Sequence, residues 1–291
     1  MVSKTHGTVE ETTPANAAPP QKHILISGAA KGIGRCMTRH FLELGHKVFI
    51  LDFDEEELKH TAEVHLKGYF KDGRLGYELC NLRSIPEIRK TAEKAAKFFN
   101  GKIHVLINNG GISTPYWKDN ATMEDQATSD QWQAYVETNL TAPFHLSQAV
   151  LPYMKVSANY EQRKQENAGP SPCIIHVSSF RMLQSDPNQE GYASTKAGLL
   201  GLTHSMAVSL SEYGLRVNLI APGRIKVAHE SKEGDEKGLE WSLDEDDREK
   251  HATNRAGKPE DIATCAEFLI GAGFITGQSI TVDGGASIRK T

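Results

Sequence analysis

From Lys22 onward, short apolar runs alternate with longer amphipathic segments. The apolar runs are continuous and rich in Val, Ile and Leu, which is typical of strands buried on both faces. We predict strands over 23–28, 47–54, 75–80, 103–111, 173–179, 215–223 and 279–285. Helical periodicity predicts helices over 32–45, 55–66, 85–99, 130–155, 192–213 and 259–269. This regular alternation predicts one α/β domain with a doubly wound parallel sheet of about seven strands.

Residues 1–21 form a polar segment without the apolar core of a signal peptide, and we expect them to be a disordered N-terminal tail. The α/β domain then occupies residues 22–291. Residues 156–172 are a polar stretch, which we interpret as a surface insertion before the fifth strand.

A long charged stretch, residues 224–251, follows the sixth strand. Because it leaves the strand edge where such sheets bind ligands, we interpret it as a substrate lid. The alternative is a disordered decoration with no part in the site. Ser242 and Glu245 have the spacing of a capping box, which predicts a helix inside this stretch.

Charge and cysteine content narrow the function classes. The formal net charge of -4 and the lack of a long basic stretch argue against a nucleic-acid partner. The longest apolar runs fall short of the ~20 residues that a membrane span needs. The four cysteines lack metal-ligand or CxxC spacing and fit reduced thiols in a cytoplasmic protein. No cluster of His, Asp, Glu and Cys predicts a metal site.

A glycine-rich turn, SGAAKGIG at 27–34, follows the first strand and opens the first helix. Gly28, Gly32 and Gly34 would let the backbone turn tightly and approach a pyrophosphate at the helix N-terminus. Asp52, at the end of the second strand, would accept hydrogen bonds from the ribose hydroxyls and repel a 2′-phosphate, which favours NAD over NADP. Lys31 instead favours NADP, since its cation could pair with that phosphate.

Tyr192 and Lys196 are spaced i, i+4 in the segment GYASTKAG, which predicts that they share a helix face. A cation close to a phenol favours the phenolate, so we expect a tyrosine pKa below its usual ~10. Taken alone, the pair more often means a packed tyrosine and a solvated lysine.

With these features the sequence resembles the classical short-chain dehydrogenase/reductase family from about His23 to Gly285. The matching motifs are SGAAKGIG (27–34), Asn81–Leu82, NNGG (108–111), Asn139, Ser179, YASTK (192–196), APG (221–223), RAGKPEDIA (255–263) and TGQSITVDGG (276–285). The resemblance implies a Rossmann-type sheet and an NAD(P)-dependent oxidoreductase. Such an enzyme transfers a hydride between the nicotinamide and a secondary alcohol or ketone. Other chemistry on the same fold (a dehydratase or epimerase) and a non-catalytic dinucleotide-binding protein are the alternatives.

The resemblance also implies a catalytic tetrad. Tyr192 would be the general acid/base, while Lys196 would lower its pKa and hold the nicotinamide ribose. The serine thirteen residues before the tyrosine is Ser179, whose hydroxyl would bond the reacting oxygen. Asn139 would hold a water on the proton relay.

Beside Asp52, Phe53 would lie against the adenine side of the cofactor. With Gly28, Lys31, Gly32, Gly34 and Asp52, the resemblance implies further cofactor contacts at Ile33, Asn81, Leu82, Asn109, Gly110, Gly111, Tyr192, Lys196, Pro222, Gly223, Ile225 and Val227. The sequence departs from the family at Ser27, Asn81, Gly110 and Val227. Val227 stands where threonine is usual and cannot bond the carboxamide, so we expect Ile225 backbone groups to anchor the nicotinamide.

The sequence is least informative about the substrate. Arg181 and Arg224 would bind a polar or anionic small molecule such as a polyol, sugar or hydroxy acid. Alternatively, each pairs with an acidic lid residue or faces solvent. We expect structural roles for His176 and His229. The helices at 130–155 and 192–213 are the surfaces that pair subunits in this family, which implies a homotetramer or homodimer.

Overall fold

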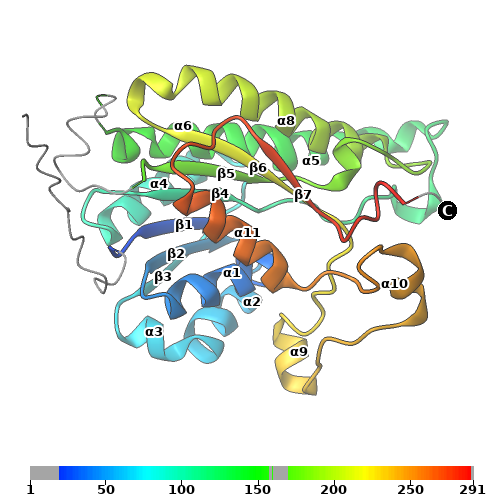
Figure 1. Cartoon of the computed structure of the whole chain (residues 1–291), viewed down its shortest axis with the longest axis horizontal. Helices are drawn as coiled ribbons and strands as arrows, with labels where there is room; N and C mark the ends of the chain where they lie inside the picture. The colour runs from blue at the N-terminus through cyan, green and yellow to red at the C-terminus, as the bar shows by residue number, and fades with distance from the viewer. Residues whose placement is uncertain (1–19, 157–158, 160–169, 290–291) are drawn as a thin grey trace, which may run out of the picture.

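The computed structural model describes residues 20–156, 159 and 170–289. The expected tail lies outside these residues except for its last two positions, and most of the predicted insertion at 156–172 also lies outside them. The seven predicted strands are all present and form one sheet in the order β3-β2-β1-β4-β5-β6-β7 (Figure 1). Every neighbouring pair is parallel, which confirms the predicted doubly wound sheet.

The strand bounds agree with the sequence pattern to within a few residues. The strands are β1 His23–Ser27, β2 Lys47–Asp52, β3 Leu75–Leu79, β4 Val105–Asn108, β5 Cys173–Val177, β6 Arg216–Pro222 and β7 Ser279–Val282. The fourth strand ends three residues before the predicted Gly111, because Asn109 and Gly110 leave the ladder to contact the glycine turn.

The helices follow the predicted periodicity, with two local changes of helix type. The α-helices are α1 Gly32–Glu43, α2 Glu55–Lys59, α3 Lys67–Lys71, α4 Ile85–Phe98, α5 Ser129–Tyr135, α6 Ala142–Met154, α8 Glu190–Ser209, α9 Lys232–Lys237, α10 Glu245–Lys250 and α11 Pro259–Gly271. π-helical turns occupy His60–His65 and Val136–Thr141, so the predicted helix over 130–155 widens in its middle. Such turns are common at functional sites.

Side chains of each strand alternate between two apolar layers. Ile24 and Ile26 of β1 pack in a core with α1 and α11, whereas Leu25 packs in a second core with α4, α6 and α8. Figure 1 shows α1, α2 and α3 on one side of the sheet and α6 and α8 on the other. This double burial explains why the strands read as continuous apolar runs rather than alternating ones. Within the described part of the chain, no helix is both long and apolar enough to cross a bilayer.

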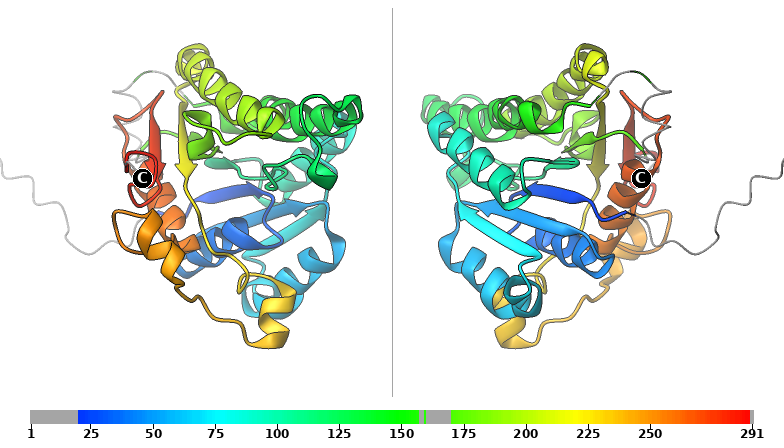
Figure 2. Two further views of the ribbon diagram at one scale, coloured as in Figure 1. Left: turned by 90° about the vertical axis from the view of Figure 1, so that its right-hand side faces the viewer. Right: turned by 90° about the vertical axis from the view of Figure 1, so that its left-hand side faces the viewer.

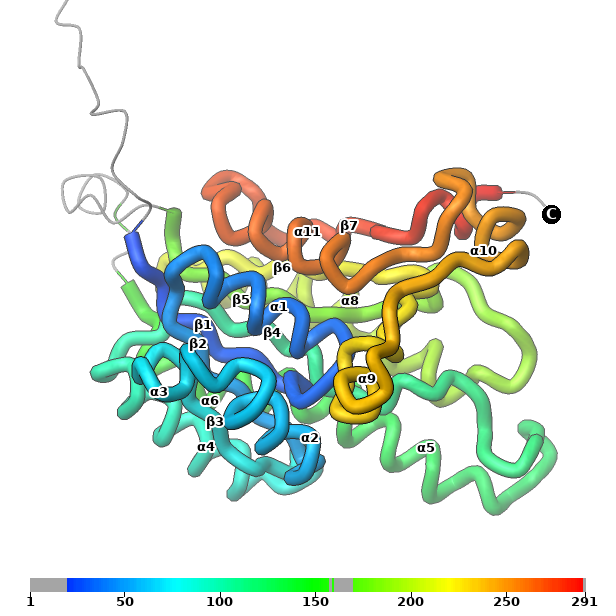
Figure 3. Tube along the Cα trace, turned by 90° about the horizontal axis from the view of Figure 1, so that it is seen from below, coloured from blue at the N-terminus to red at the C-terminus, as the bar shows by residue number. Residues whose placement is uncertain are grey.

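The strand order reverses between β1 and β4, so the carboxyl ends of these strands open a crevice of the kind that binds ligands in such sheets. The segment interpreted as a lid begins at the same edge, after β6. It carries two short helices: α9 lies beside α1 and α2, and α10 lies near the C-terminus (Figures 1 and 3). The predicted capping box at Ser242 and Glu245 is wrong, since Asp244 and Asp247 form the box that begins α10.

Candidate active site at the carboxyl edge of the sheet

The glycine-rich turn folds so tightly that side chains cannot replace its glycines. Gly28 has φ +63°, and a Cβ there would lie 2.3 Å from the Gly110 Cα. A Cβ on Gly34 would lie 2.2 Å from the Gly28 carbonyl oxygen. Asn109 Nδ2 donates to that oxygen at 2.7 Å, and Ser27 Oγ accepts from the Gly110 N–H at 3.0 Å. The turn thus presents bare backbone at the start of α1, which fits a dinucleotide pyrophosphate.

Asp52 is buried at the end of β2, with 8% of its surface exposed. Its carboxylate accepts from the backbone N–H groups of Ala30 at 3.0 Å, Phe53 at 2.8 Å and Asp54 at 3.2 Å. Burial raises the carboxyl pKa, while these three backbone hydrogen bonds lower it. Asp52 therefore fixes the glycine turn as well as the edge where an adenosine ribose would bind. The neighbouring Phe53 is 77% exposed and free to cover an adenine.

Lys31 is held by acidic neighbours in the structure. Its Nζ lies 3.2 Å from an Asp54 oxygen and 3.9 Å from a Glu57 oxygen. The cation that the sequence analysis weighed in favour of NADP is thus paired with carboxylates.

Lys196 and Tyr192 lie on one face of α8, as the i, i+4 spacing predicts. Lys196 Nζ lies 5.6 Å from the centroid of the Tyr192 ring and donates to the Val177 carbonyl at 3.1 Å. The lysine is 6% exposed, and burial lowers its pKa to about 8. A cationic group is therefore seated beside the phenol with little water around it.

The expected lowering of the Tyr192 pKa is wrong for the chain taken alone. Burial raises the pKa of Tyr192, and the nearby Tyr135 adds to the rise. Hydrogen bonding with Ser179 and the charge of Arg181 lower it, but by less than burial raises it. The physical reason is that a buried phenolate loses more solvation than these neighbours return.

Asn139 lies in the π-helical turn and is 1% exposed. Its Oδ1 accepts from the Ile112 N–H at 2.7 Å, and its Nδ2 donates to the Ile112 carbonyl at 3.3 Å and to Thr195 Oγ1 at 3.4 Å. A Cβ on Gly111 would lie 3.0 Å from Asn139 Oδ1 and 3.6 Å from Lys196 Nζ. Asn139 and Lys196 therefore meet at Gly111, beside the glycine turn.

Ser179 lies two residues after the end of β5 and is 6% exposed. Its hydroxyl accepts from the Arg181 N–H at 3.2 Å. The structure thus gathers the four predicted catalytic residues at one end of the sheet, from the segment after β5, from α8 and from the π-helical turn.

Two aromatic residues pack behind Tyr192, and one of them, Tyr135, was not singled out from the sequence. The Tyr135 ring lies edge-on to Tyr192 with centroids 6.3 Å apart, and Trp117 lies edge-on to Tyr135 at 5.8 Å. Tyr135 is fully buried, and its hydroxyl donates to the Thr114 carbonyl at 2.7 Å. A Cβ on Gly191 would lie 2.7 Å from both Trp117 and Tyr135. The small residue before Tyr192 was the only signal in the sequence for this close packing.

The remaining transferred positions surround the turn at different depths. Leu82 reaches the space beside Gly110, and Val227 covers Gly32, with its side chain 3.7 Å from where a Cβ would stand. Ile225 forms a bridge with Gly257. Asn81 is exposed and accepts from the Arg83 N–H through Oδ1 at 3.0 Å. Pro222 ends β6, and the Gly223 N–H donates to Val282.

Both arginines that were candidates for substrate binding have acidic partners. Arg181 pairs with Asp186, which also accepts from the Tyr116 hydroxyl at 3.2 Å. Arg224 lies 3.6 Å from Asp247 and 3.9 Å from Asp244. The alternative in which an arginine pairs with an acidic lid residue therefore describes Arg224, while the partner of Arg181 lies outside the lid. The two predicted structural histidines, His176 and His229, belong to β5 and to the segment after β6.

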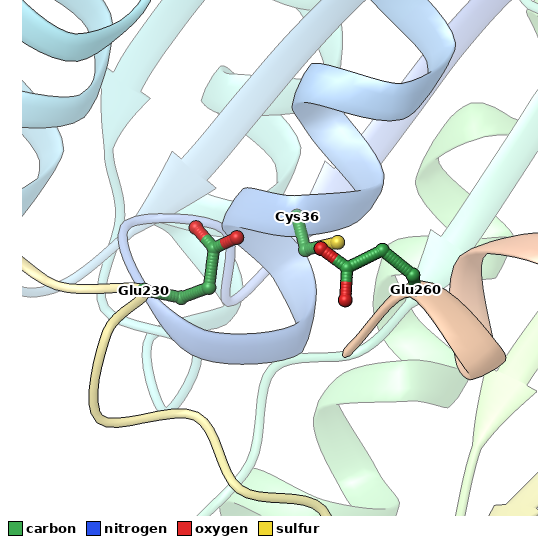
Figure 4. A group of neighbouring side chains, drawn as sticks. All are labelled: Cys36, Glu230 and Glu260. Atoms are coloured by element: carbon green, nitrogen blue, oxygen red, sulfur yellow. The ribbon is translucent and has the colours of Figure 1, made fainter. Parts of the chain in front are cut away.

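Cys36, Glu230 and Glu260 bring together three potential metal-ligand atoms from α1, the segment after β6 and α11 (Figure 4). Two arginines already pair with the carboxylates of this group, since Arg35 also donates to Glu230 at 2.8 Å. Arg39 donates to Glu230 at 2.5 Å, to Glu260 at 3.2 Å and to Cys36 Sγ at 3.7 Å. Burial and the two glutamates raise the thiol pKa, which keeps the sulfur protonated. We therefore interpret the cluster as an ion-paired contact between segments.

Known proteins resemble this chain over most of its length. A family model described as enoyl-(acyl carrier protein) reductase matches residues 28–287. The 3-oxoacyl-[acyl-carrier-protein] reductase FabG of Thermotoga maritima is 33% identical over 269 residues, which are 92% of this chain and 98% of that protein. An uncharacterized oxidoreductase of the same organism is 32% identical over 272 residues, covering 92% of this chain and 96% of that protein.

Solved structures agree with the fold and the family. An apo SCOR enzyme from Clostridium thermocellum matches with a TM-score of 0.72 and 28% identity over 93% of this chain and 94% of that one. ElxO with NADP bound matches with a TM-score of 0.72 and 26% identity over 92% of this chain and 98% of that one. Together with the glycine turn and the parallel sheet, these matches show that the chain belongs to the classical short-chain dehydrogenase/reductase family and is an oxidoreductase of that type.

Proposed function

We propose that the protein interconverts a secondary alcohol and a ketone with NAD as its cofactor. The observation that carries this proposal is the convergence of Ser179, Tyr192, Lys196 and Asn139 beside the glycine turn. A bound nicotinamide dinucleotide would supply or accept the hydride. The chain's own residues then have to bind the reacting oxygen and move its proton.

Tyr192 is the proton-exchanging group in this proposal. In the oxidative direction it takes the alcohol proton, and in the reductive direction it protonates the oxygen of the developing alkoxide. The buried Lys196 cation supports the phenolate form, and Ser179 donates a hydrogen bond to the reacting oxygen. Asn139, whose side chain is fixed by the Ile112 backbone, would hold a water on the proton relay.

NAD is favoured because the ribose end of the site is acidic. Asp52 closes β2, and Asp54 and Glu57 already pair with Lys31. A 2′-phosphate would meet these carboxylates and would have to displace Lys31 from them. Proteins of similar structure bind either dinucleotide: ElxO holds NADP, whereas a Brucella melitensis 3-ketoacyl-(acyl-carrier-protein) reductase is complexed with NADH.

We further propose a polar, neutral substrate such as a polyol, sugar or ketone. Arg181 and Arg224 are both paired with carboxylates, so an anionic substrate would have to compete for them. The relatives named 3-oxoacyl-[acyl-carrier-protein] reductases favour ketone reduction as the direction.

Subunit pairing and location are also proposals. Phe144 of α6 is 44% exposed and Val208 of α8 is 77% exposed, and these helices would join copies of the chain into a homodimer or homotetramer. The four cysteines are free in the structure, which supports a cytoplasmic location.

The test is a substrate screen read at the absorbance band of the reduced cofactor. Polyols, sugars, hydroxysteroids and hydroxy acids are offered with NAD, and the matching ketones with NADH. We expect stoichiometric NADH formation or loss with at least one uncharged compound. Binding of dinucleotide without turnover on any compound would favour a non-catalytic role, and product formation without net redox change would favour a dehydratase or epimerase.

A further inference from the structure

Residues 227–235, which we name the clamp, cross from the end of the sheet to the start of α1 and α2. Figure 2 shows the chain leaving β6 and descending to α9 beside these helices. The clamp therefore lies against the cofactor half of the molecule, whereas a substrate lid was expected from the sequence. This position suggests that the clamp acts on the cofactor rather than on the substrate.

The clamp touches the glycine turn through its backbone and one apolar side chain. The Gly32 N–H donates to the Glu230 carbonyl at 2.7 Å, so the clamp uses one of the N–H groups that open α1. Val227 covers the outer side of Gly32. A pyrophosphate resting on the turn would thus have the clamp as its outer wall.

A buried ion network fastens the clamp to α1. Arg35 is 1% exposed and Glu230 is 2% exposed, and they are joined at 2.8 Å. Arg35 also donates to Asp235 at 2.8 Å and to the His229 carbonyl at 3.0 Å. Arg39, from the next turn of the helix, binds the second oxygen of Glu230. Two arginines of one helix therefore hold a single clamp glutamate.

The clamp also binds α2 and the π-helical turn that follows it. His60 lies 2.8 Å and His65 lies 3.2 Å from Asp235. The Lys232 N–H donates to Glu57 at 2.8 Å, and the Lys232 side chain pairs with Glu56. Glu57 is also a partner of Lys31 in the glycine turn. The clamp is thus connected to both sides of the expected dinucleotide site.

We propose that Glu230 is a positioning residue that locks the clamp over the bound dinucleotide and so slows its release. This inference rests on the proposed function, because it requires that a dinucleotide occupies the glycine turn. The cofactor has to pass between the turn and the clamp, and opening that passage separates Glu230 from Arg35 and Arg39. Removing the negative charge leaves Arg35 with Asp235 and Arg39 with Glu260 as their remaining carboxylate partners. The closed state then loses the one buried glutamate that both arginines share.

The test is the dissociation of NADH from the purified protein without substrate, followed by NADH fluorescence in a stopped-flow instrument. For Glu230→Gln we expect release at least tenfold faster and a Kd at least tenfold higher than wild type. Glu233→Gln is the matched control, because Glu233 lies in the same segment but pairs only with the exposed Lys237 among the described residues. We expect this control to match the wild type.

A second variant keeps the test sound if Glu230→Gln does not fold, which circular dichroism would show. Asp235→Asn removes a half-exposed partner of Arg35 and should speed release two- to fivefold. Release unchanged in a folded Glu230→Gln, or a Kd lower than wild type, would overturn the proposal; the lower Kd would mean that the clamp blocks the turn. A wild-type protein that binds neither NADH nor NADPH would overturn the proposed function itself.

Discussion

Two buried cations, Lys196 and Arg35, border the expected dinucleotide site, and the structure holds them in opposite ways. Lys196 donates to one backbone carbonyl, and no carboxylate pairs with it in the described ranges. Arg35 is bound by two carboxylates and a carbonyl. Both side chains are almost fully buried.

The contrast indicates different purposes. A buried cation without a counter-ion is costly and has a shifted pKa, which suits a group that assists proton transfer. A buried cation with two counter-ions holds two segments together, because breaking its ion pairs leaves unpaired charges buried away from water. The buried Lys196 therefore lowers the stability of the fold in return for reactivity at the catalytic site. The ion pairs of Arg35 instead hold the clamp on α1.

The largest expected effect comes from replacing the lone cation. Lys196→Met should lower turnover by about 10³ because the phenolate loses its nearby positive charge. The same change should stabilise the fold at pH 7 by up to about 3 kcal/mol, since a pKa lowered from 10.5 to about 8 reports the cost of burying the charge.

Denaturant unfolding across pH tests this stability gain. Between pH 8 and 10.5 the unfolded wild type binds more protons than the folded form, so wild-type stability rises with pH. The advantage of Lys196→Met should be full below pH 8 and vanish above about 10.5. A variant less stable than wild type at pH 7 would contradict the idea that the lysine is held at a cost.

Replacing the paired cation should have the opposite effect on stability. Arg35→Met leaves the buried Glu230 with Arg39 alone and removes the arginine partner of Asp235, so it should lower the free energy of unfolding by about 3 kcal/mol. Lys237→Met, which removes an exposed pair on α9, should leave that free energy unchanged within error. If the two substitutions lowered the free energy of unfolding in urea equally, the Arg35 network would contribute no more to stability than an exposed ion pair.

A smaller effect is expected at the ribose end. Asp52→Asn should reduce the ratio of kcat/KM for NAD over NADP by about tenfold, because it removes the charge that opposes a 2′-phosphate. Glu55→Gln is a suitable control, since Glu55 is exposed and pairs with Lys59. A wild type that already prefers NADP would show that Asp52 serves only to hold the glycine turn.

The smallest effect is expected at Arg181. Because Asp186 already neutralises it, Arg181→Ala should change KM for the best uncharged substrate by less than threefold. Steady-state kinetics settle the point. A rise in KM of tenfold or more would mean that the guanidinium binds the substrate directly. An anionic substrate would then be favoured.

Local patterns in the sequence were sufficient for the sheet and for much of the candidate site. Continuous apolar runs located all seven strands, and motif spacing brought Ser179, Tyr192 and Lys196 to one end of the sheet. The clamp was out of reach, because Arg35 and Glu230 are 195 residues apart and each reads as an ordinary polar position. The direction of the Tyr192 pKa shift was also missed, because burial of the phenol raises that pKa and the i, i+4 spacing says nothing about how deeply the ring is buried.

The most direct measurement is single-turnover hydride transfer in Tyr192→Phe beside the wild type, with NADH binding followed on the same samples. We expect the variant to bind NADH within twofold of wild type, because the phenol oxygen is not part of the glycine turn, and we expect its transfer rate to fall by about 10³. A folded variant that retains most of its transfer rate would contradict the assignment of Tyr192 as the proton-exchanging group.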